Sequence, residues 1–327
     1  MQSLYVVDSG AFSVKYNYGL KQSKKQSLTE LKEHKHAEPF NRNISHFCDT
    51  FTRACEYVFE EEGRGEYDDD VTLLVLLDTL TRPKEKETVL YASFERFGAK
   101  KVSLVYSAAT TLYAAGETSG VCVDLGFSSV RVSTIFNSVS FPTLCAASSG
   151  VGGHRVDEAI RQHCLTLPNY ETLECIKNQQ CYVGEGGGGT TTLTLPDGTS
   201  FVSDLTADSA RDAAHRMLYS DAMNVPRSLC HILECASIQF ASPLRYALAG
   251  NGANMKGVSS AFADVLSHSL LQVVPKCLYL KNPHWAAVEG GTILSQLSTF
   301  KSMCVDATEY EEEGPTRCTY GKIVDPR

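Results

Sequence analysis

The tetrapeptide Val-Asp-x-Gly occurs twice in this chain, at residues 7–10 and at residues 123–126. The first copy lies in YVVDSGAFSVKYNYG and the second in GVCVDLGFSSVRVSTIF. In both, an apolar run enters a glycine-containing turn and a second run leaves it, the pattern of a β-hairpin. Because one supersecondary design occurs in both halves of the chain, we predict a duplicated fold with a cleft between its halves.

The chain has 327 residues, more than one hydrophobic core normally organises, so we expect two lobes. Residues 71–78 predict a buried strand, and residues 101–107 predict another strand. A helix that begins at Pro83 and ends at Gly98 separates them, and a short helix ending near Gly116 follows. A further helical stripe runs through residues 43–59, with Ile44, Phe47, Phe51, Cys55 and Val58 on one face. This alternation of strands and helices predicts an α/β fold.

Composition excludes several functional classes. The net charge of −8 argues against direct binding of nucleic acid, whose phosphates attract basic surfaces. The longest apolar run, residues 73–77, is too short to cross a bilayer, and the first residues lack the pattern of a signal peptide. The 12 cysteines include no C-x-x-C pair, so we expect reduced thiols. We therefore expect a soluble protein that contacts neither membranes nor nucleic acid.

Three biased segments carry competing interpretations. Residues 21–43 are polar and basic, which predicts a loop or mobile insertion. The acidic run 60–70 could bind a divalent metal, but such runs are more often solvated. Residues 181–202 contain four consecutive glycines; they lack the Lys-Ser/Thr of a phosphate loop, so we favour a linker followed by a hairpin around Pro196 and Gly198.

The last third of the chain contains two further signals. YALAGNGANMKGV, at residues 246–258, predicts a strand that runs into a glycine-rich turn. A helix is expected to begin at Thr292, after Gly290 and Gly291, and to bury Ile293, Leu297 and Phe300.

Together the two hairpins, the PKEKETVLYASFERFG helix, the glycine-rich turn and the ending GGTILSQLSTF…EYEEEGP resemble the actin family. The chain looks like a divergent actin-related protein. The resemblance implies a two-lobed α/β fold of the type shared with hexokinase and heat-shock chaperones, with duplicated sheet-and-helix halves. It implies a first lobe at 1–116, a second lobe at 117–284 with a reduced outer subdomain at about 165–215, and a segment 285–327 that returns to the first lobe.

In this family, ATP and a divalent cation bind between the lobes. Turn glycines allow backbone N–H groups to approach phosphates, and an aspartate lies near the cation. The resemblance implies that Asp8 would hold Mg²⁺ through water. The positions that match the family's nucleotide contacts are Asp8, Ser9, Gly10, Lys15, Asp124, Gly126, Lys177, Gly250, Asn251 and Met255.

Five departures from the family pattern affect the expected chemistry. Phe12 and Ser128 replace glycines, Phe127 replaces an aspartate that holds a cation-bound water, Ser107 replaces the glutamine that orients the attacking water, and Asn178 replaces a glutamate. Phosphoryl transfer depends on positioning and electrostatics, so these losses would remove several kcal/mol, or roughly a thousandfold in rate. We expect no catalysis of consequence. Whether ATP or ADP with Mg²⁺ still binds, or no nucleotide does, stays open.

The sequence thus favours a non-catalytic scaffold subunit of a larger cytoskeletal assembly, with other actin-like or cytoskeletal proteins as partners. The segment 21–43 is much shorter than its actin counterpart, which reaches the next subunit, so we expect no homofilament. The alternatives are an active, polymerising actin-like ATPase, a nuclear subunit of a chromatin-remodelling complex, and a small-molecule kinase. No basic cluster longer than Lys24-Lys25 is present, which favours the cytoplasm over the nucleus.

Overall fold

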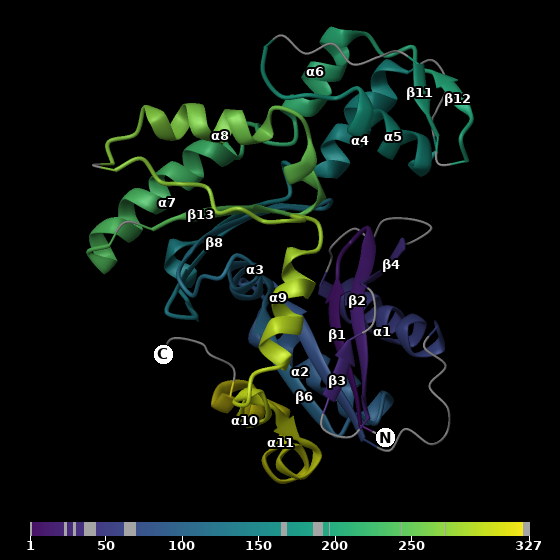
Figure 1. The fold of residues 1–327 in the computed structure, drawn as a ribbon, viewed down its shortest axis with the longest axis vertical. Helices are drawn as coiled ribbons and strands as arrows, with labels where there is room; N and C mark the ends of the chain where they lie inside the picture. Colours follow the sequence, from purple (N-terminus) through teal and green to yellow (C-terminus); the bar gives the residue numbers. More distant parts are fainter. Residues whose placement is uncertain are drawn as a thin grey trace. The chain divides into compact units, whose positions relative to one another are not determined.

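The computed structural model describes residues 2–22, 25–28, 31–35, 44–61, 70–164, 169–185, 192–195, 197–242, 244–271 and 273–322. The chain forms two compact units (Figure 1). Unit 1 comprises Met1–Gly120, Ile135–Thr143 and Trp285–Arg327, and unit 2 comprises Val121–Thr134 and Leu144–His284. Each unit is built on its own sheet.

Unit 1 contains a seven-stranded sheet in the order β14-β6-β5-β1-β2-β3, with β4 also paired to β2. Strands β1, β5 and β6 are parallel, and β2 returns antiparallel to β1. The strands are β1 (Gln2–Ser9), β2 (Ser13–Gln22), β3 (Lys25–Leu28), β4 (Lys32–Lys35), β5 (Asp70–Leu77), β6 (Lys101–Tyr106) and β14 (Val305–Asp306).

Helices cover both faces of this sheet. They are α1 (Ile44–Glu61), α2 (Pro83–Tyr91), α3 (Ser107–Ala114), α9 (Ala286–Ser295), α10 (Phe300–Met303) and α11 (Ala307–Lys322). Val6 and Leu74 pack in one cluster with Val288 of α9, whereas the Tyr5 ring meets Phe59 of α1 on the opposite face, 5.0 Å between centroids. A strand buried on both faces is apolar throughout, which explains the run at 71–77.

Several predicted elements of unit 1 are confirmed. The predicted strands correspond to β5 and β6, and α1 spans the predicted helical stripe. The helix from Pro83 continues beyond Tyr91 as a π-helical turn, Ala92–Arg96, and ends at Gly98, whose φ of 57° suits only glycine without strain.

The interpretation of residues 21–43 as a loop is wrong for the part that the structure describes. Strands β3 and β4 both pair antiparallel with β2. The His34 ring stacks on Tyr57 of α1, with 3.6 Å between centroids, and Ser13 Oγ donates to Glu33 Oε1 at 2.5 Å. Backbone hydrogen bonds and these polar contacts hold the strands, so the segment needs few apolar anchors.

The helix predicted from Thr292 is also wrong in its start and its buried face. Helix α9 begins at Ala286 and includes Gly290 and Gly291, while Ile293 and Leu297 are exposed; only the burial of Phe300 is confirmed. A Cβ at Gly290 would lie 1.6 Å from the Thr110 carbonyl oxygen of α3. Gly290 therefore permits close packing of α9 on α3, Gly291 permits close packing on Val6 of β1 and Leu76 of β5, and neither glycine ends a turn.

Unit 2 contains the sheet β10-β8-β7-β13, in which β13 is parallel to β7 and β10 is antiparallel to β8. The short β9 (Val139–Ser140) pairs with the last two residues of β8, Ile135 and Phe136, and this part of the chain belongs to unit 1. The other strands are β7 (Gly120–Leu125), β8 (Val130–Phe136), β10 (Ala146–Ser148), β11 (Thr192–Thr194), β12 (Ser200–Val202) and β13 (Tyr246–Ala249).

The helices of unit 2 are α4 (Gly153–His163), α5 (Tyr170–Gln179), α6 (Ala207–His215), α7 (Val225–Phe240) and α8 (Val258–Ser267). Strands β11 and β12 confirm the hairpin predicted around Gly198. The four-glycine run at 186–189 and most of the acidic run, 62–69, lie outside the described residues. Among the described helices, none combines the length and apolar character required to span a bilayer.

Candidate functional site

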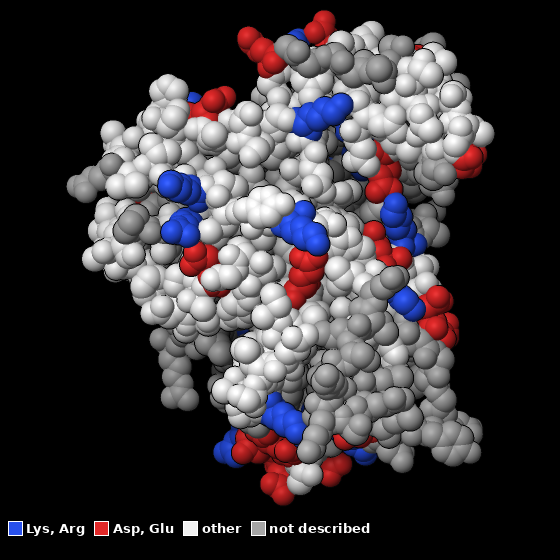
Figure 2. Space-filling view, viewed as in Figure 1, with Lys and Arg blue, Asp and Glu red and all other residues white. Residues whose placement is uncertain are grey.

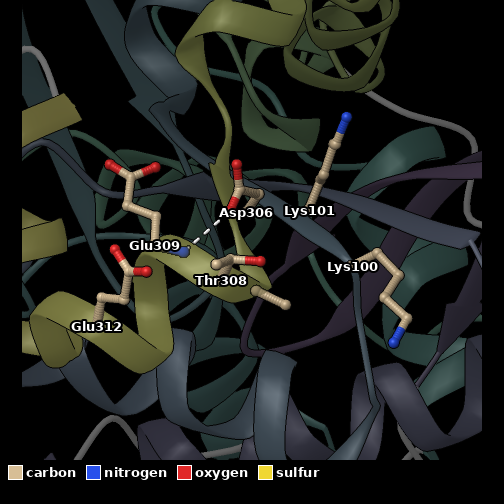
Figure 3. A pocket seen from close by; sticks show the side chains of 7 residues that line it. Lys100, Lys101, Asp306, Thr308, Glu309 and Glu312 are labelled. Atoms are coloured by element: carbon tan, nitrogen blue, oxygen red, sulfur yellow. Dashed lines mark hydrogen bonds between the residues drawn. The ribbon is translucent and has the colours of Figure 1, made fainter.

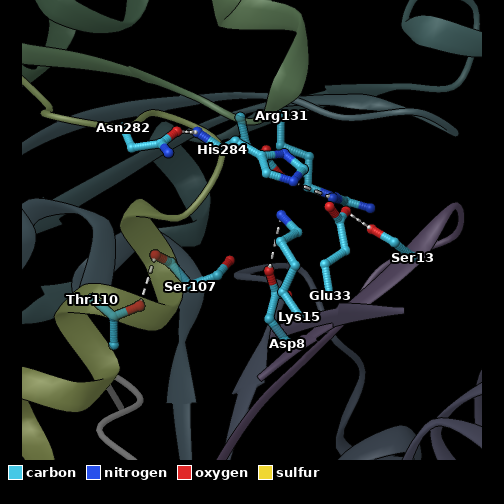
Figure 4. A network of polar contacts seen from close by, with 10 residues as sticks. Asp8, Ser13, Lys15, Glu33, Ser107, Thr110, Arg131, Asn282 and His284 are labelled. Atoms are coloured by element: carbon cyan, nitrogen blue, oxygen red, sulfur yellow. Dashed lines mark hydrogen bonds and ion pairs between the residues drawn. The ribbon is translucent and has the colours of Figure 1, made fainter. Parts of the chain in front are cut away.

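The first hairpin lies in unit 1, where β1 turns into β2. The Gly10 N–H donates to the Ser13 carbonyl oxygen at 3.0 Å, and a Cβ at Gly10 would approach that oxygen to 2.9 Å. The register places Asp8 opposite Lys15, and Lys15 Nζ lies 3.5 Å from Asp8 Oδ2 (Figure 4). Both side chains are largely buried. Asp8 and Lys15, which both match the family pattern, therefore contact each other across the first hairpin.

The water-positioning residue expected from the family is absent from unit 1. Ser107 begins α3 at the carboxyl end of β6, and its carbonyl oxygen accepts from Thr110 Oγ1 at 3.0 Å (Figure 4). A serine side chain is two bond lengths shorter than a glutamine. Phe12 occupies the turn of the hairpin and is half-buried.

The second hairpin, between β7 and β8 in unit 2, repeats this geometry. A Cβ at Gly126 would lie 2.8 Å from the Ser129 carbonyl oxygen, the same contact that Gly10 avoids in the first hairpin. Arg131 Nη1 lies 3.3 Å from Asp124 Oδ2. Arg131 follows Asp124 by the same number of residues as Lys15 follows Asp8. Each hairpin thus pairs its aspartate with a basic residue of its own return strand.

Sequence reasoning missed Arg131, although the duplication could have revealed it. Aligning the two Val-Asp-x-Gly motifs places Arg131 opposite Lys15. Only the folded structure shows that the guanidinium reaches the carboxylate.

Lys177, predicted as a nucleoside contact, has a protein partner in unit 2. Its Nζ lies 2.8 Å from Asp157 Oδ1, and the two side chains are 13% and 7% exposed. The same Nζ lies over the Phe127 ring, 5.5 Å from its centroid. Burial raises the pKa of the Asp157 carboxyl above its ordinary value, and this effect outweighs the opposing pull of Lys177. Lys177 therefore joins α5 to α4 and to the second hairpin.

The N-terminus of α4 is also occupied by the second hairpin. The Gly153 N–H donates to the Gly126 carbonyl oxygen at 3.0 Å, and the His154 N–H donates to the Phe127 carbonyl oxygen at 3.0 Å. Gly152 has φ of 124°, and a Cβ there would lie 2.9 Å from the Phe127 oxygen. A helix N-terminus with open N–H groups binds anions. Here these groups bind backbone carbonyls instead.

The glycine-rich turn is brought next to the second hairpin. A Cβ at Gly250 would lie 2.7 Å from Asp124 Oδ1, and the Gly250 N–H donates to the Pro283 carbonyl oxygen at 3.0 Å. Asn251 is exposed and Met255 is buried. Asp124, Gly126, Lys177 and Gly250 thus converge within unit 2, whereas Asp8, Ser9, Gly10 and Lys15 converge within unit 1.

The charged nucleotide-site candidates of both units contact protein side chains. Both hairpin aspartates lie against a basic side chain, and Lys177 lies against Asp157 and Phe127. Within the described part of the chain, no group of three or more His, Cys, Asp or Glu side chains could ligate a metal ion. Unpaired carboxylates and open N–H groups are what Mg²⁺ and phosphates require.

A separate surface pocket of about 500 Å³ lies in unit 1 where β6 begins, at the end of the parallel strands opposite the first hairpin (Figure 3). Its charged side chains have both signs, and the Glu309 N–H donates to Asp306 Oδ1 at 2.9 Å. The lining residues are Lys100, Lys101, Asp306, Ala307, Thr308, Glu309 and Glu312. Acidic side chains also gather over α11 at the bottom of Figure 2. This mixed lining does not resemble a nucleotide site.

Comparison with known families supports the fold that the hairpins indicate. The actin family model matches residues 4–186, which is more than half of the 327-residue chain. The matched region contains both hairpins, β5 through α5, and Lys177. With its mixed α/β content and its duplicated hairpins, the chain belongs to the actin family and has the actin-like fold.

Proposed function

We propose that this chain is a divergent, non-catalytic member of the actin family that serves as a structural subunit of a larger cytoskeletal assembly. The contacts of Lys177 carry the proposal. The lysine that the family would present to a nucleoside is engaged by a buried carboxylate 2.8 Å away and lies over Phe127. Releasing it for a ligand would leave Asp157 buried without its counter-charge, which is costly.

Internal charge pairing supports the same proposal. Arg131, which is not among the positions that match the family's nucleotide contacts, supplies a positive charge to Asp124, so a divalent cation arriving there would meet like charge. Phosphoryl transfer requires a cation and a positioned water, and Ser107 is too short to orient one. The hairpins then act as parts of the fold, each joining two central strands.

The partners in this proposal are other actin-like or cytoskeletal proteins in the cytoplasm, with neither nucleic acid nor membrane bound directly. The β3 and β4 strands pair back onto β2, so the described part of the shortened segment belongs to the sheet of unit 1. We therefore expect the chain not to polymerise with itself.

The test is ATP turnover and sedimentation of the purified protein with ATP and Mg²⁺, with an actin in parallel. We expect phosphate release at the background rate and no pelleting at high speed. Sustained turnover at the rate of the actin, or sedimentable filaments, would refute the proposal. A Ser107→Gln variant is the control, because restoring one group alone should leave both readouts at background if the paired hairpins are the cause.

A further inference from the structure

On the outer edge of the unit 2 sheet, the segment of residues 273–281 contacts β13 through one isolated bridge. β13 pairs with β7 along one edge, and on its other edge Tyr246 bridges in parallel to Cys277. The Tyr246 N–H donates to the Lys276 carbonyl oxygen at 3.3 Å, and the Leu278 N–H donates to the Tyr246 carbonyl oxygen at 2.6 Å. Figure 1 shows this segment running from the end of α8 alongside β13.

The bridge to Tyr246 uses the peptide groups on either side of Cys277, so the N–H of Cys277 itself faces away from β13, and Tyr279 follows two residues later. Within the described residues, neither backbone N–H has a backbone hydrogen-bond partner. An edge with open N–H and carbonyl groups is a template for a further strand, here from Cys277 onward because Pro275 has no N–H to donate.

The side chains of this edge are apolar and basic. Val273, Val274 and Tyr279 are 63%, 53% and 82% exposed, and Lys276 and Lys281 are exposed beside them. No aspartate or glutamate occurs between residues 265 and 288, although the chain as a whole carries a net charge of −8. An acidic ligand would therefore meet no like charge from this segment itself.

We infer that residues 273–281 dock an extended, acidic, β-forming segment of another protein, which adds to the sheet as a strand. Main-chain hydrogen bonds to Cys277 and Tyr279 would supply affinity, and Lys276 and Lys281 would select glutamate or aspartate side chains. A second copy of this chain is a poor occupant, because β3 and β4, at one edge of its unit 1 sheet, contain three lysines and one glutamate. The inference rests on the proposed function, since a structural subunit must bind neighbours.

The probe is a synthetic peptide of about ten residues that alternates valine and glutamate, the length of a typical strand. A valine–lysine peptide and a valine–glutamate peptide interrupted by prolines are measured in parallel. In fluorescence anisotropy we expect saturable binding of the acidic peptide alone. In hydrogen exchange we expect that peptide to protect the Cys277 and Tyr279 amides. Equal binding of the basic or proline peptide, no binding of the acidic one, or protection elsewhere would overturn the inference.

The double variant Lys276→Glu/Lys281→Glu should bind the acidic peptide about tenfold more weakly, since each exposed ion pair contributes up to about 1 kcal/mol. The matched control is Arg211→Glu/Arg216→Glu, which reverses two arginines in and directly after α6 and should leave affinity unchanged. An equal effect of both variants would contradict a local site. None of these readouts involves ATP. A failure of peptide binding would contradict this inference, whereas detectable ATP turnover would contradict the proposed function.

Discussion

At the scale of single residues, two basic side chains provide the ion-pair partners of the hairpin aspartates. Lys15 and Arg131 each contact the aspartate that precedes the turn of their own hairpin. The motifs predicted Asp8, Lys15 and Asp124 from sequence. They did not predict that Asp157 would engage Lys177, because the two residues lie on different helices and no local spacing relates them.

The contact between Arg131 and Asp124 can be tested by replacing Arg131 with methionine. Arg131→Met should lower the free energy of unfolding by about 1 kcal/mol, the range for partly exposed pairs. It should also make the melting temperature rise with Mg²⁺, because Asp124 loses a competing positive charge. In thermal denaturation we expect Mg²⁺ to leave the melting temperature of the wild type unchanged.

Arg155→Met is the matched control, because Arg155 forms an exposed ion pair with Glu158 in the same unit. It should show no response to Mg²⁺. Equal stabilisation of the wild type and Arg131→Met by Mg²⁺ would show that Arg131 does not exclude a cation.

The raised pKa of Asp157 predicts a pH dependence. In the unfolded chain this carboxyl titrates near 3.8, whereas burial raises its pKa in the folded state. The folded protein therefore binds the proton more tightly, and this contribution to stability is lost as pH rises from about 4 through the folded pKa. Asp157→Asn removes the titration. Its melting temperature should thus rise relative to that of the wild type as the pH rises above about 4.

Asp212→Asn, on the exposed face of α6, is the control and should follow the wild type across this pH range. If the melting temperature of Asp157→Asn instead fell relative to that of the wild type as the pH rises, Lys177 would outweigh burial and hold the pKa of Asp157 below its ordinary value.

At the scale of elements, the periodicity of apolar residues predicted the buried strands and helices. Backbone pairing and close backbone contacts determined the elements that it missed. The apolar run of β5 and the stripe of α1 were predictable because buried faces require apolar residues. β3 and β4 were not, because backbone pairing with β2 leaves little apolar signal. The start of α9 was missed because Gly290 fits Thr110 of a distant helix, and only the folded chain shows that contact.

Gly290→Ala tests this reading of α9. The added Cβ would lie 1.6 Å from the Thr110 carbonyl oxygen, so α9 must shift away from α3. We expect destabilisation of more than about 3 kcal/mol in urea denaturation. Gly116→Ala is the control: no atom lies within 4 Å of its Cβ, and only the φ of 76° is strained, which costs about 1 to 2 kcal/mol. Equal losses would contradict a packing role for Gly290.

At the scale of the whole molecule, the repeated hairpin predicted the duplication, and each unit contains one hairpin beside its central strands. The family resemblance supplied the residues that would contact a nucleotide. The structure adds what those residues contact now: Asp8 lies against Lys15, Asp124 against Arg131, and Lys177 against Asp157. Side-chain partners of this kind follow from register and helix packing, which a motif does not encode.

The central claim is that the chain's own side chains have replaced the ligands of its nucleotide hairpins. Titration of the purified protein with ATP and Mg²⁺, followed by calorimetry and thermal denaturation, tests it most directly. A ligand at a hundredfold its Kd adds about 2.7 kcal/mol of stability, enough to raise Tm by several degrees. We predict no saturable heat and a Tm shift below about 1 °C at roughly millimolar ATP. Saturable binding with a micromolar Kd and a Tm increase of several degrees would contradict the account.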